Sequence, residues 1–196
     1  GIGAEREVSL ASGKSCAQAL RDTGVLFEEI IVEKDTSFLC GDRKMTEHEG
    51  LEFLEKENAL VFQVIHGTYG EDGELVKKLE TNQIACIGST SDVLEMTINK
   101  YKTEVFLRKN KIPTTESVLV TSISDISVVK GMVFPVIIKP NKEGSSVGVI
   151  KVDKEEDLKS AVEKSLEICN EILVQTCIHG REFTCGVLEI GGENVS

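Results

Sequence analysis

Apolar and polar residues alternate along the first half of the sequence in a pattern that predicts helices and strands in turn. Residues 7–21 carry apolar side chains at helical spacing. Apolar runs at 26–32, 59–65 and 84–88 are typical of strands, the second of them a near-continuous buried one, and residues 73–80 fit a short helix. Strands that alternate with helices indicate a parallel, wound α/β sheet.

The pattern becomes mixed α+β from about residue 89. Residues 92–110 predict one or two helices, and a further helix over 153–168 is expected to begin with Asp153 as its N-cap. We therefore predict two domains, 1–88 and 89–196. In the second half the other expected elements are strands at 117–120, 136–140, 171–177 and 181–189 and a short helix at 123–130. In the first half, residues 33–57, between the strands predicted at 26–32 and 59–65, predict a charged surface connection with one helix.

The segment from Val136 to Val149 is the most informative part of the chain. An apolar strand ends on Lys139 and Pro140, a loop with glycines and paired serines follows, and a second apolar strand returns. Such a loop can bring backbone N–H groups, hydroxyls and a lysine close to a polyphosphate, because nothing bulky separates the backbone from the ligand. Taken alone, the same residues also fit a plain hairpin whose glycines only form a turn.

A second glycine-rich loop, His66 to Gly73, directly follows the predicted strand at 59–65. Ligands bind at the carboxyl ends of parallel strands in open α/β sheets, so this loop is a candidate binding segment. The alternative is a polar turn with Asp72 and Gly73 at its corner.

Composition and charge narrow the class of protein. With 40% apolar and 28% charged residues, the 196-residue chain fits a soluble globular protein, and no apolar run is long enough to predict a membrane span. The net charge of −11 argues against nucleic-acid binding, although Lys100, Lys139 and Lys142 could form a local basic site. The six cysteines include no C-x-x-C pair and are expected to be buried free thiols. Neither end looks natural, and we expect a fragment of a longer protein.

Six short segments of the sequence form an ordered set of motifs: residues 4–10, 66–73, 99–103, 112–115, 139–148 and 180–184. In this order they resemble the D-alanine–D-alanine ligases of the ATP-grasp superfamily. The resemblance implies an N-terminal wound parallel-sheet (pre-ATP-grasp) domain without its first strand, followed by a partial α+β ATP-grasp domain. It implies ATP-dependent ligation of two D-alanines through an acylphosphate, for peptidoglycan precursor synthesis and hence cell-wall biogenesis and cell shape, in the cytoplasm.

The resemblance also implies roles for individual residues. Glu5 corresponds to the acid that holds the ammonium of the first D-alanine, His66 to a substrate-pocket histidine, and Ser145 to a serine that contacts the substrates and acts with Glu5 in catalysis. Lys100 and Lys139 correspond to lysines that contact ATP phosphates. The other nucleotide positions are the loop Glu143, Gly144, Ser145, Ser146 and Val147, the adenine-binding strand edge Gln175, Thr176, Cys177 and Ile178, and the ribose-binding acid Glu182.

Several of these positions have a plainer interpretation. Glu5 could simply favour a helix N-terminus, and His66 could be held by backbone groups at a strand end. Lys139 could be solvated, and Glu182 could pair with Arg181 on the surface. His48 and His179 are expected to be surface histidines. The chain also departs from the family pattern: Leu75 is followed by Val76 and Lys77 where a small polar pair is usual, and Gln175 stands where the family often carries an acid, so an amide oxygen would meet the adenine.

The resemblance implies ATP and Mg²⁺ or Mn²⁺ as cofactors, D-alanine as substrate and a homodimer as the assembly. It places the metal ligands, an arginine and the tyrosine partner of Ser145 outside these 196 residues, so no metal ligand is expected in this chain and the fragment alone should be inactive. The alternatives are a ligase that makes D-alanyl-D-lactate or D-alanyl-D-serine, and a non-catalytic nucleotide-binding domain.

Overall fold

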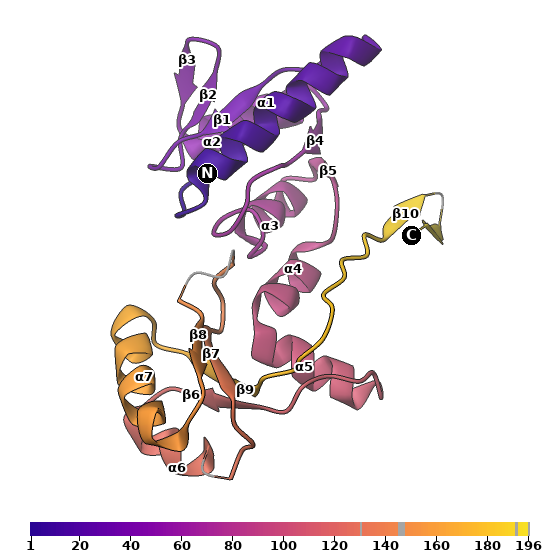
Figure 1. The fold of residues 1–196 in the computed structure, drawn as a ribbon. Coiled ribbons are helices and arrows are strands. Elements are labelled where there is room, and N and C mark those ends of the chain that lie inside the picture. Colours follow the sequence, from indigo (N-terminus) through magenta and orange to yellow (C-terminus); the bar gives the residue numbers. More distant parts are fainter. Residues whose placement is uncertain (130, 145–147, 191, 196) are drawn as a thin grey trace.

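The computed structural model describes residues 1–129, 131–144, 148–190 and 192–195, which form a mixture of helices and strands (Figure 1). In chain order they are α1 Arg6–Thr23, β1 Ile30–Val32, β2 Phe38–Cys40, β3 Arg43–Met45, α2 Glu47–Lys56, β4 Leu60–Phe62, α3 Glu74–Thr81, β5 Ala85–Ile87, α4 Ser91–Ile98, α5 Lys100–Lys109, β6 Ser117–Val120, the 3₁₀ helix η1 Ile123–Asp125, α6 Ile126–Val129, β7 Val136–Pro140, β8 Ile150–Val152, α7 Glu155–Ile168, β9 Ile172–Thr176, β10 Leu188–Ile190 and β11 Glu193–Val195.

The first half contains the expected parallel strands. β4 and β5 pair in parallel, with α3 in the connection between them, and α1 forms where helical spacing predicted it. The prediction of a long buried strand at 59–65 was wrong, because β4 has three residues and Leu60 and Phe62 are 64% and 53% exposed. Only the Val61 and Cys86 side of this two-stranded sheet packs against the apolar cluster.

A small antiparallel sheet, β1–β2–β3, stands beside the parallel pair. The strand predicted over 26–32 is limited to β1, and the segment 33–57, expected to be irregular apart from one helix, also contains β2 and β3. α2 is the helix expected there, and it begins with a capping box in which Thr46 and Glu49 satisfy each other's backbone N–H groups. Short strands with charged residues hide their period-2 pattern, so the sequence missed this sheet.

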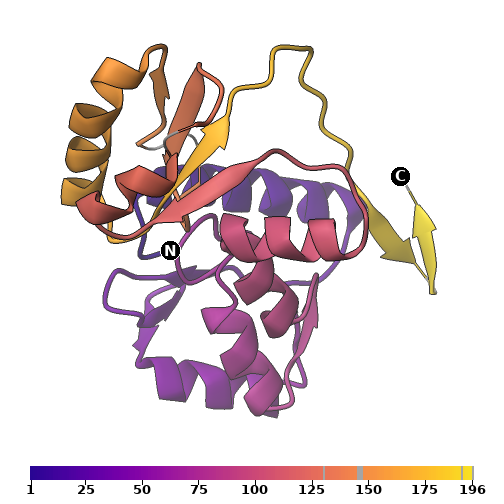
Figure 2. The same cartoon turned by 90° about the horizontal axis from the view of Figure 1, so that it is seen from below.

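The second half is built on a four-stranded antiparallel sheet in the order β6-β9-β7-β8, with α6 and α7 beside it (Figures 1 and 2). Its strands β6, β7 and β9 fall where the apolar runs predicted them, and their alternate residues face α7 in the core. α7 begins after Lys154, so Asp153 is not its N-cap; Asp153 instead lies 2.7 Å from the Lys151 ammonium on β8.

The chain leaves this sheet after β9 and runs as an extended connection to the hairpin β10–β11 (Figures 1 and 2). The strand predicted over 181–189 was therefore wrong except at its end, because residues 177–187 form no regular structure and Phe183 is 79% exposed. The apolar residues of this segment have the spacing of a strand, but the segment is not buried against a neighbouring strand.

Two apolar clusters form the interior. One joins α2, α3 and the small sheets of the first half, and the other joins β6–β9 with α6 and α7. The domain boundary near residue 88 stays a prediction. The six cysteines are free, as expected, but none is fully buried and Cys185 is exposed, so that part of the expectation was wrong. His48 and His179 are exposed, as predicted. No helix in the described ranges is both long and apolar enough to cross a membrane.

Candidate functional site

Three segments that are distant in sequence meet at the carboxylate of Glu5. A Cβ atom added to Gly67, in the loop after β4, would lie 2.5 Å from Glu5 Oε2, and one added to Gly144, in the loop after β7, would lie 3.1 Å from it. Glu5 occupies the N-cap position of α1, but its side chain does not cap the helix. Glycine at both positions thus allows two loops to approach one carboxylate.

His66 lies in the same loop as Gly67 and is held by side chains of α1. Its Nε2 is 2.9 Å from Ser12 Oγ, and its backbone N–H donates to Ser9 Oγ at 3.0 Å. The other ring nitrogen lies 3.5 Å from Glu71 Oε1. The ring is therefore fixed by side chains on both sides. The contact with Ser12 was not predicted, although the i, i+3 spacing of Ser9 and Ser12 on one helical face is a signal for it.

Lys100 and Lys139 form a half-buried pair of cations. Lys100 is the first residue of α5 and donates to the carbonyl oxygens of Asn141 (3.4 Å) and Glu143. Burial lowers the pKa of Lys100 and the neighbouring Lys139 charge lowers it further. Burial also lowers the pKa of Lys139, opposed by the charge of Glu104. Among the described residues neither ammonium forms an ion pair with a carboxylate. Two such charges are suited to an anionic ligand.

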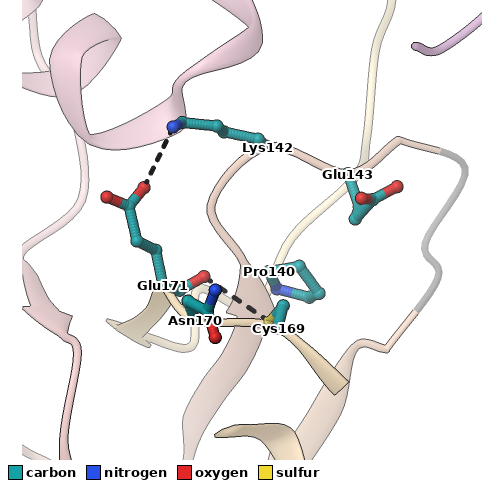
Figure 3. A pocket seen from close by; sticks show the side chains of 6 residues that line it. All are labelled: Pro140, Lys142, Glu143, Cys169, Asn170 and Glu171. Atoms are coloured by element: carbon teal, nitrogen blue, oxygen red, sulfur yellow. Dashed lines mark hydrogen bonds and ion pairs between the residues drawn. The ribbon is translucent and has the colours of Figure 1, made fainter.

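The predicted phosphate loop is described only in part. Glu143 and Gly144 lie in the described chain, whereas Ser145, Ser146 and Val147 lie outside the described residues, so the catalytic role of Ser145 stays a prediction. At the root of the hairpin, a cavity of about 400 Å³ opens between the hairpin and the start of β9 (Figure 3). In it, the Lys142 ammonium lies 3.5 Å from Glu171 Oε2. Its lining residues are Pro140, Lys142, Glu143, Cys169, Asn170 and Glu171.

Gln175 projects from the same face of the sheet as Lys139, because it pairs with Ile137 across β9 and β7. Its amide NH₂ donates to the carboxylate of Glu104 and to Thr115 Oγ1, which leaves the amide oxygen as the acceptor that the sequence analysis expected. Glu104 is itself 6% exposed and also accepts from Ser117 Oγ. This acid was missed, because a glutamate in the middle of a charged helix has the pattern of a solvent-exposed residue.

The other residues predicted to bind adenine and ribose are less favourably placed. The backbone N–H groups of Thr176 and Cys177 already donate to other carbonyl oxygens, and Ile178 is 71% exposed. Glu182 is exposed within the irregular segment 177–187. Arg181 does not pair with it in the described structure but lies over the Phe183 ring, 5.1 Å from its centroid. Among the ion pairs of the described residues, none joins Glu182 to Lys100 or Lys139.

The described part of the chain contains no group of three or more His, Cys, Asp or Glu side chains arranged to hold a metal ion. Mg²⁺ prefers several oxygen ligands in near-octahedral geometry, and these residues do not provide that set. No chemical step is therefore assigned to a metal held by these residues.

Comparison with known proteins gives a consistent match. The family model described as "D-ala D-ala ligase C-terminus" matches residues 95–196. The D-alanine–D-alanine ligase of Fervidobacterium nodosum is 34% identical over 98% of this chain and 61% of that protein, and ligase B of Clostridium perfringens is 33% identical over 95% and 58%. The chain thus spans about three-fifths of the length of these curated relatives.

Solved structures show the same likeness. The D-alanine–D-alanine ligase from Helicobacter pylori superposes with a TM-score of 0.74 at 27% identity, over 92% of this chain and 65% of that one. The D-alanyl-alanine synthetase A of Vibrio cholerae, at 21% identity and a TM-score of 0.81 over 100% of this chain and 62% of that one, shares the fold.

The fold and the paired lysines beside a glycine-rich hairpin define an α/β protein of the ATP-grasp class. Within that class, the chain belongs to the D-alanine–D-alanine ligase family.

Proposed function

We propose that the protein containing this sequence is an ATP-dependent D-alanine–D-alanine ligase. When ATP is bound, it supplies the phosphoryl group that turns the carboxylate of one D-alanine into an acylphosphate, which the amine of a second D-alanine attacks to release phosphate and form the dipeptide. The observation that carries this proposal is the half-buried pair Lys100 and Lys139 beside a glycine-rich loop that reaches Glu5.

The lysines supply the charge that phosphoryl transfer needs. Phosphoryl transfer is catalysed mainly by positioning and by neutralising the charge on phosphate oxygens. Burial lowers the pKa of both ammonium groups, because it removes part of their hydration. A polyphosphate that takes the place of this hydration therefore gains more binding free energy than it would from exposed lysines. Lys100 has two of its three N–H donors directed at hairpin carbonyls, which leaves one for a phosphate oxygen.

Glu5 supplies the complementary charge for the amino acid. Its carboxylate lies against the backbone at both Gly67 and Gly144, so a substrate ammonium held there would lie beside the phosphate-binding hairpin. We assign His66 to the same substrate pocket, with Ser12 and Glu71 setting its ring orientation. The hairpin then brings the phosphate of one ligand and the carboxylate of the other within one site and excludes water.

The remaining assignments follow from the family. We propose two units, 1–88 and 89–196, with ATP contacts from Ser145, Ser146, Val147, Gln175 to Ile178 and Glu182, and with Mg²⁺ or Mn²⁺ held by residues outside this sequence. A homodimer, a cytoplasmic location and a role in peptidoglycan synthesis, and so in cell shape, belong to the same proposal.

Phosphate release by the full-length protein, measured with and without D-alanine, tests this proposal. D-alanine-dependent release is expected, and a Lys139→Ala variant should bind ATP about 10- to 100-fold more weakly, because one charge-assisted hydrogen bond contributes about 1.5–3 kcal/mol. Lys159→Ala is the matched control: this lysine lies on α7, its side chain is 70% exposed, and no change is expected.

The alternatives give different results in the same assay. ATP binding without D-alanine-dependent turnover would identify a non-catalytic nucleotide-binding domain. Release stimulated more strongly by D-alanine with D-serine or D-lactate than by D-alanine alone would identify a ligase of altered second-substrate choice. The VanG D-Ala:D-Ser ligase of Enterococcus faecalis is 26% identical, with a TM-score of 0.66 over 92% of this chain and 51% of that one, so this alternative is tested directly.

A further inference from the structure

Asn141 follows the strand that carries Lys139 and is 1% exposed, yet every polar group of the residue has a partner. Its side-chain oxygen accepts the backbone N–H of Tyr101 at 3.0 Å, and its side-chain nitrogen donates to Glu171 Oε2 at 2.9 Å. Its backbone N–H donates to the Glu171 carbonyl at 3.0 Å. One buried residue thus ties the root of the hairpin to the start of α5 and to the start of β9.

The same residue contacts Lys100 directly. The Asn141 carbonyl accepts from the backbone N–H of Lys100 at 3.1 Å and from the Lys100 ammonium at 3.4 Å. Lys139 lies two residues earlier on the strand. The separation of the two ammonium groups, one on α5 and one on β7, is therefore set through the Asn141 peptide.

Glu171 fixes the orientation of the Asn141 amide. The Asn141 amide nitrogen can only donate and the Glu171 carboxylate can only accept, so the hydrogen bond sets which end of the amide faces Glu171. This hydrogen bond, and after it the charge of Lys142, lowers the pKa of Glu171. Glu171 and Lys142 also form the ion pair visible in the cavity of Figure 3. A buried amide with all its partners in place holds a defined geometry, because each lost contact leaves an unsatisfied polar group.

We propose that Asn141 is a positioning residue for nucleotide binding: through its bridge to Glu171 it holds Lys100 at the distance from Lys139 that one polyphosphate can span. This inference rests on the proposed function of the two lysines.

The test is the Kd for ATP of the full-length protein, measured by calorimetry beside the KM for D-alanine and the melting temperature. Asn141→Ala should weaken ATP binding about tenfold and change the KM for D-alanine less than about twofold, since two hydrogen bonds near Lys100 are lost. Glu171→Gln should bind ATP nearly as the parent does, because the glutamine oxygen still accepts from Asn141.

Exchanging the hydrogen-bond donor and acceptor between positions 141 and 171 distinguishes a positioning role from a merely structural one. Asn141→Asp removes the donor and places two carboxylates together, so ATP binding should weaken at least tenfold. Adding Glu171→Gln restores the bridge with donor and acceptor reversed, and affinity should recover to within about threefold of the parent.

An Asn141→Ala variant with a lowered melting temperature and an unchanged Kd for ATP would overturn the inference, and so would a double variant that binds as weakly as Asn141→Asp. Lys100→Ala separates this failure from that of the proposed function. If Lys100→Ala binds ATP as tightly as the parent, the phosphate-binding role of the lysine is itself wrong, and the role of Asn141 fails with it.

Discussion

At the scale of single residues, the chemistry rests on charges kept partly out of water. Lys100 and Lys139 both lose hydration, which disfavours their ammonium forms, and the charge of Lys139 disfavours the ammonium form of Lys100 further. Glu104, which is buried, partly offsets this cost for Lys139. Without a ligand, keeping both lysines charged therefore costs more free energy here than it would for two lysines on the surface. A bound anion removes that cost.

This arrangement predicts that ATP binding takes up protons at alkaline pH. Without nucleotide the lysine pKa values are lowered; bound phosphates favour the ammonium forms and raise them again. Above the lowered pKa values, binding must therefore protonate the lysines, and ATP affinity falls as pH rises toward the ordinary pKa of lysine, about 10.4. Calorimetry in two buffers with different ionisation enthalpies measures the protons taken up.

Replacing both lysines by arginine supplies the control, because arginine stays protonated throughout this range. The Lys100→Arg, Lys139→Arg protein should take up no protons at these sites. Proton uptake that persists unchanged in this variant would show that other groups titrate on binding and would contradict the prediction.

At the scale of single residues, the sequence identified those candidate residues whose chemical type and local motif by themselves suggest a role. The lysines, Glu5 and His66 could be proposed from their motifs, whereas Ser12, Asn141 and Glu104 could not. These three act through partners 30 to 71 residues away. Long-range pairing of that kind depends on the packing of helices and strands, which no local pattern records.

At the scale of elements, the hairpin and the start of α5 form the core of the candidate site. α5 begins at Lys100 and is capped by Asn99, whose side chain accepts the backbone N–H of Lys102 at 2.9 Å. This cap fixes where the helix starts and hence where Lys100 stands. The hairpin also needs a specific backbone geometry just before β8, where Gly148 has a φ of +70° and lies against the Pro140 ring.

Gly148→Ala should therefore destabilise the protein by about 1–2 kcal/mol, because a side chain is disfavoured at positive φ and its Cβ would lie 2.9 Å from Pro140 Cγ. Urea unfolding of parent and variant measures the difference in the free energy of unfolding. Gly180→Ala is the matched control, since its added Cβ would have no atom within 4 Å. Equal stabilities of the two variants would refute the conformational role of Gly148.

Long elements with regular patterns were predicted well, as α1, α5, β7 and β9 show. The errors lie in segments whose state depends on neighbours. The 181–187 segment has apolar residues at strand spacing, but no described strand pairs with it, so it stays irregular and exposed. β2 and β3 formed because they pair with each other and β2 also pairs with β1, although neither has a strong strand pattern.

At the scale of the whole molecule, the candidate site joins residues from both halves of the chain. His66 directly follows Ile65, which packs on the first apolar cluster, whereas Lys139 and Gly144 come from the hairpin of the second. The contact of Gly144 with Glu5 is a direct link between them. A ligand bound here would therefore join the two halves and favour one relative arrangement.

Separate cores predict separate responses to core mutations. Leu79 and Ile138 are each fully buried, one in each cluster, and replacing either by alanine should cost about 2–5 kcal/mol. Hydrogen–deuterium exchange of the full-length protein should then increase mainly within residues 47–87 for Leu79→Ala and within 117–176 for Ile138→Ala.

Leu26→Ala is the control, because Leu26 is 98% exposed and its loss should leave exchange unchanged. If both core variants instead raise exchange equally over the whole chain, the two clusters unfold as one cooperative unit and the division into two units is wrong.

The sequence by itself determined the class of fold, the order of the main elements and the residues that carry charge to the site, because these depend on local periodicity and on motifs within short segments. Only the tertiary structure decided which of those residues meet. Glu5 approaches Gly144, Asn141 ties Lys100 to Glu171, and Glu182 lies exposed in an irregular segment. The physical reason is that burial, hydrogen-bond satisfaction and charge separation arise between elements that the chain brings together only when it folds.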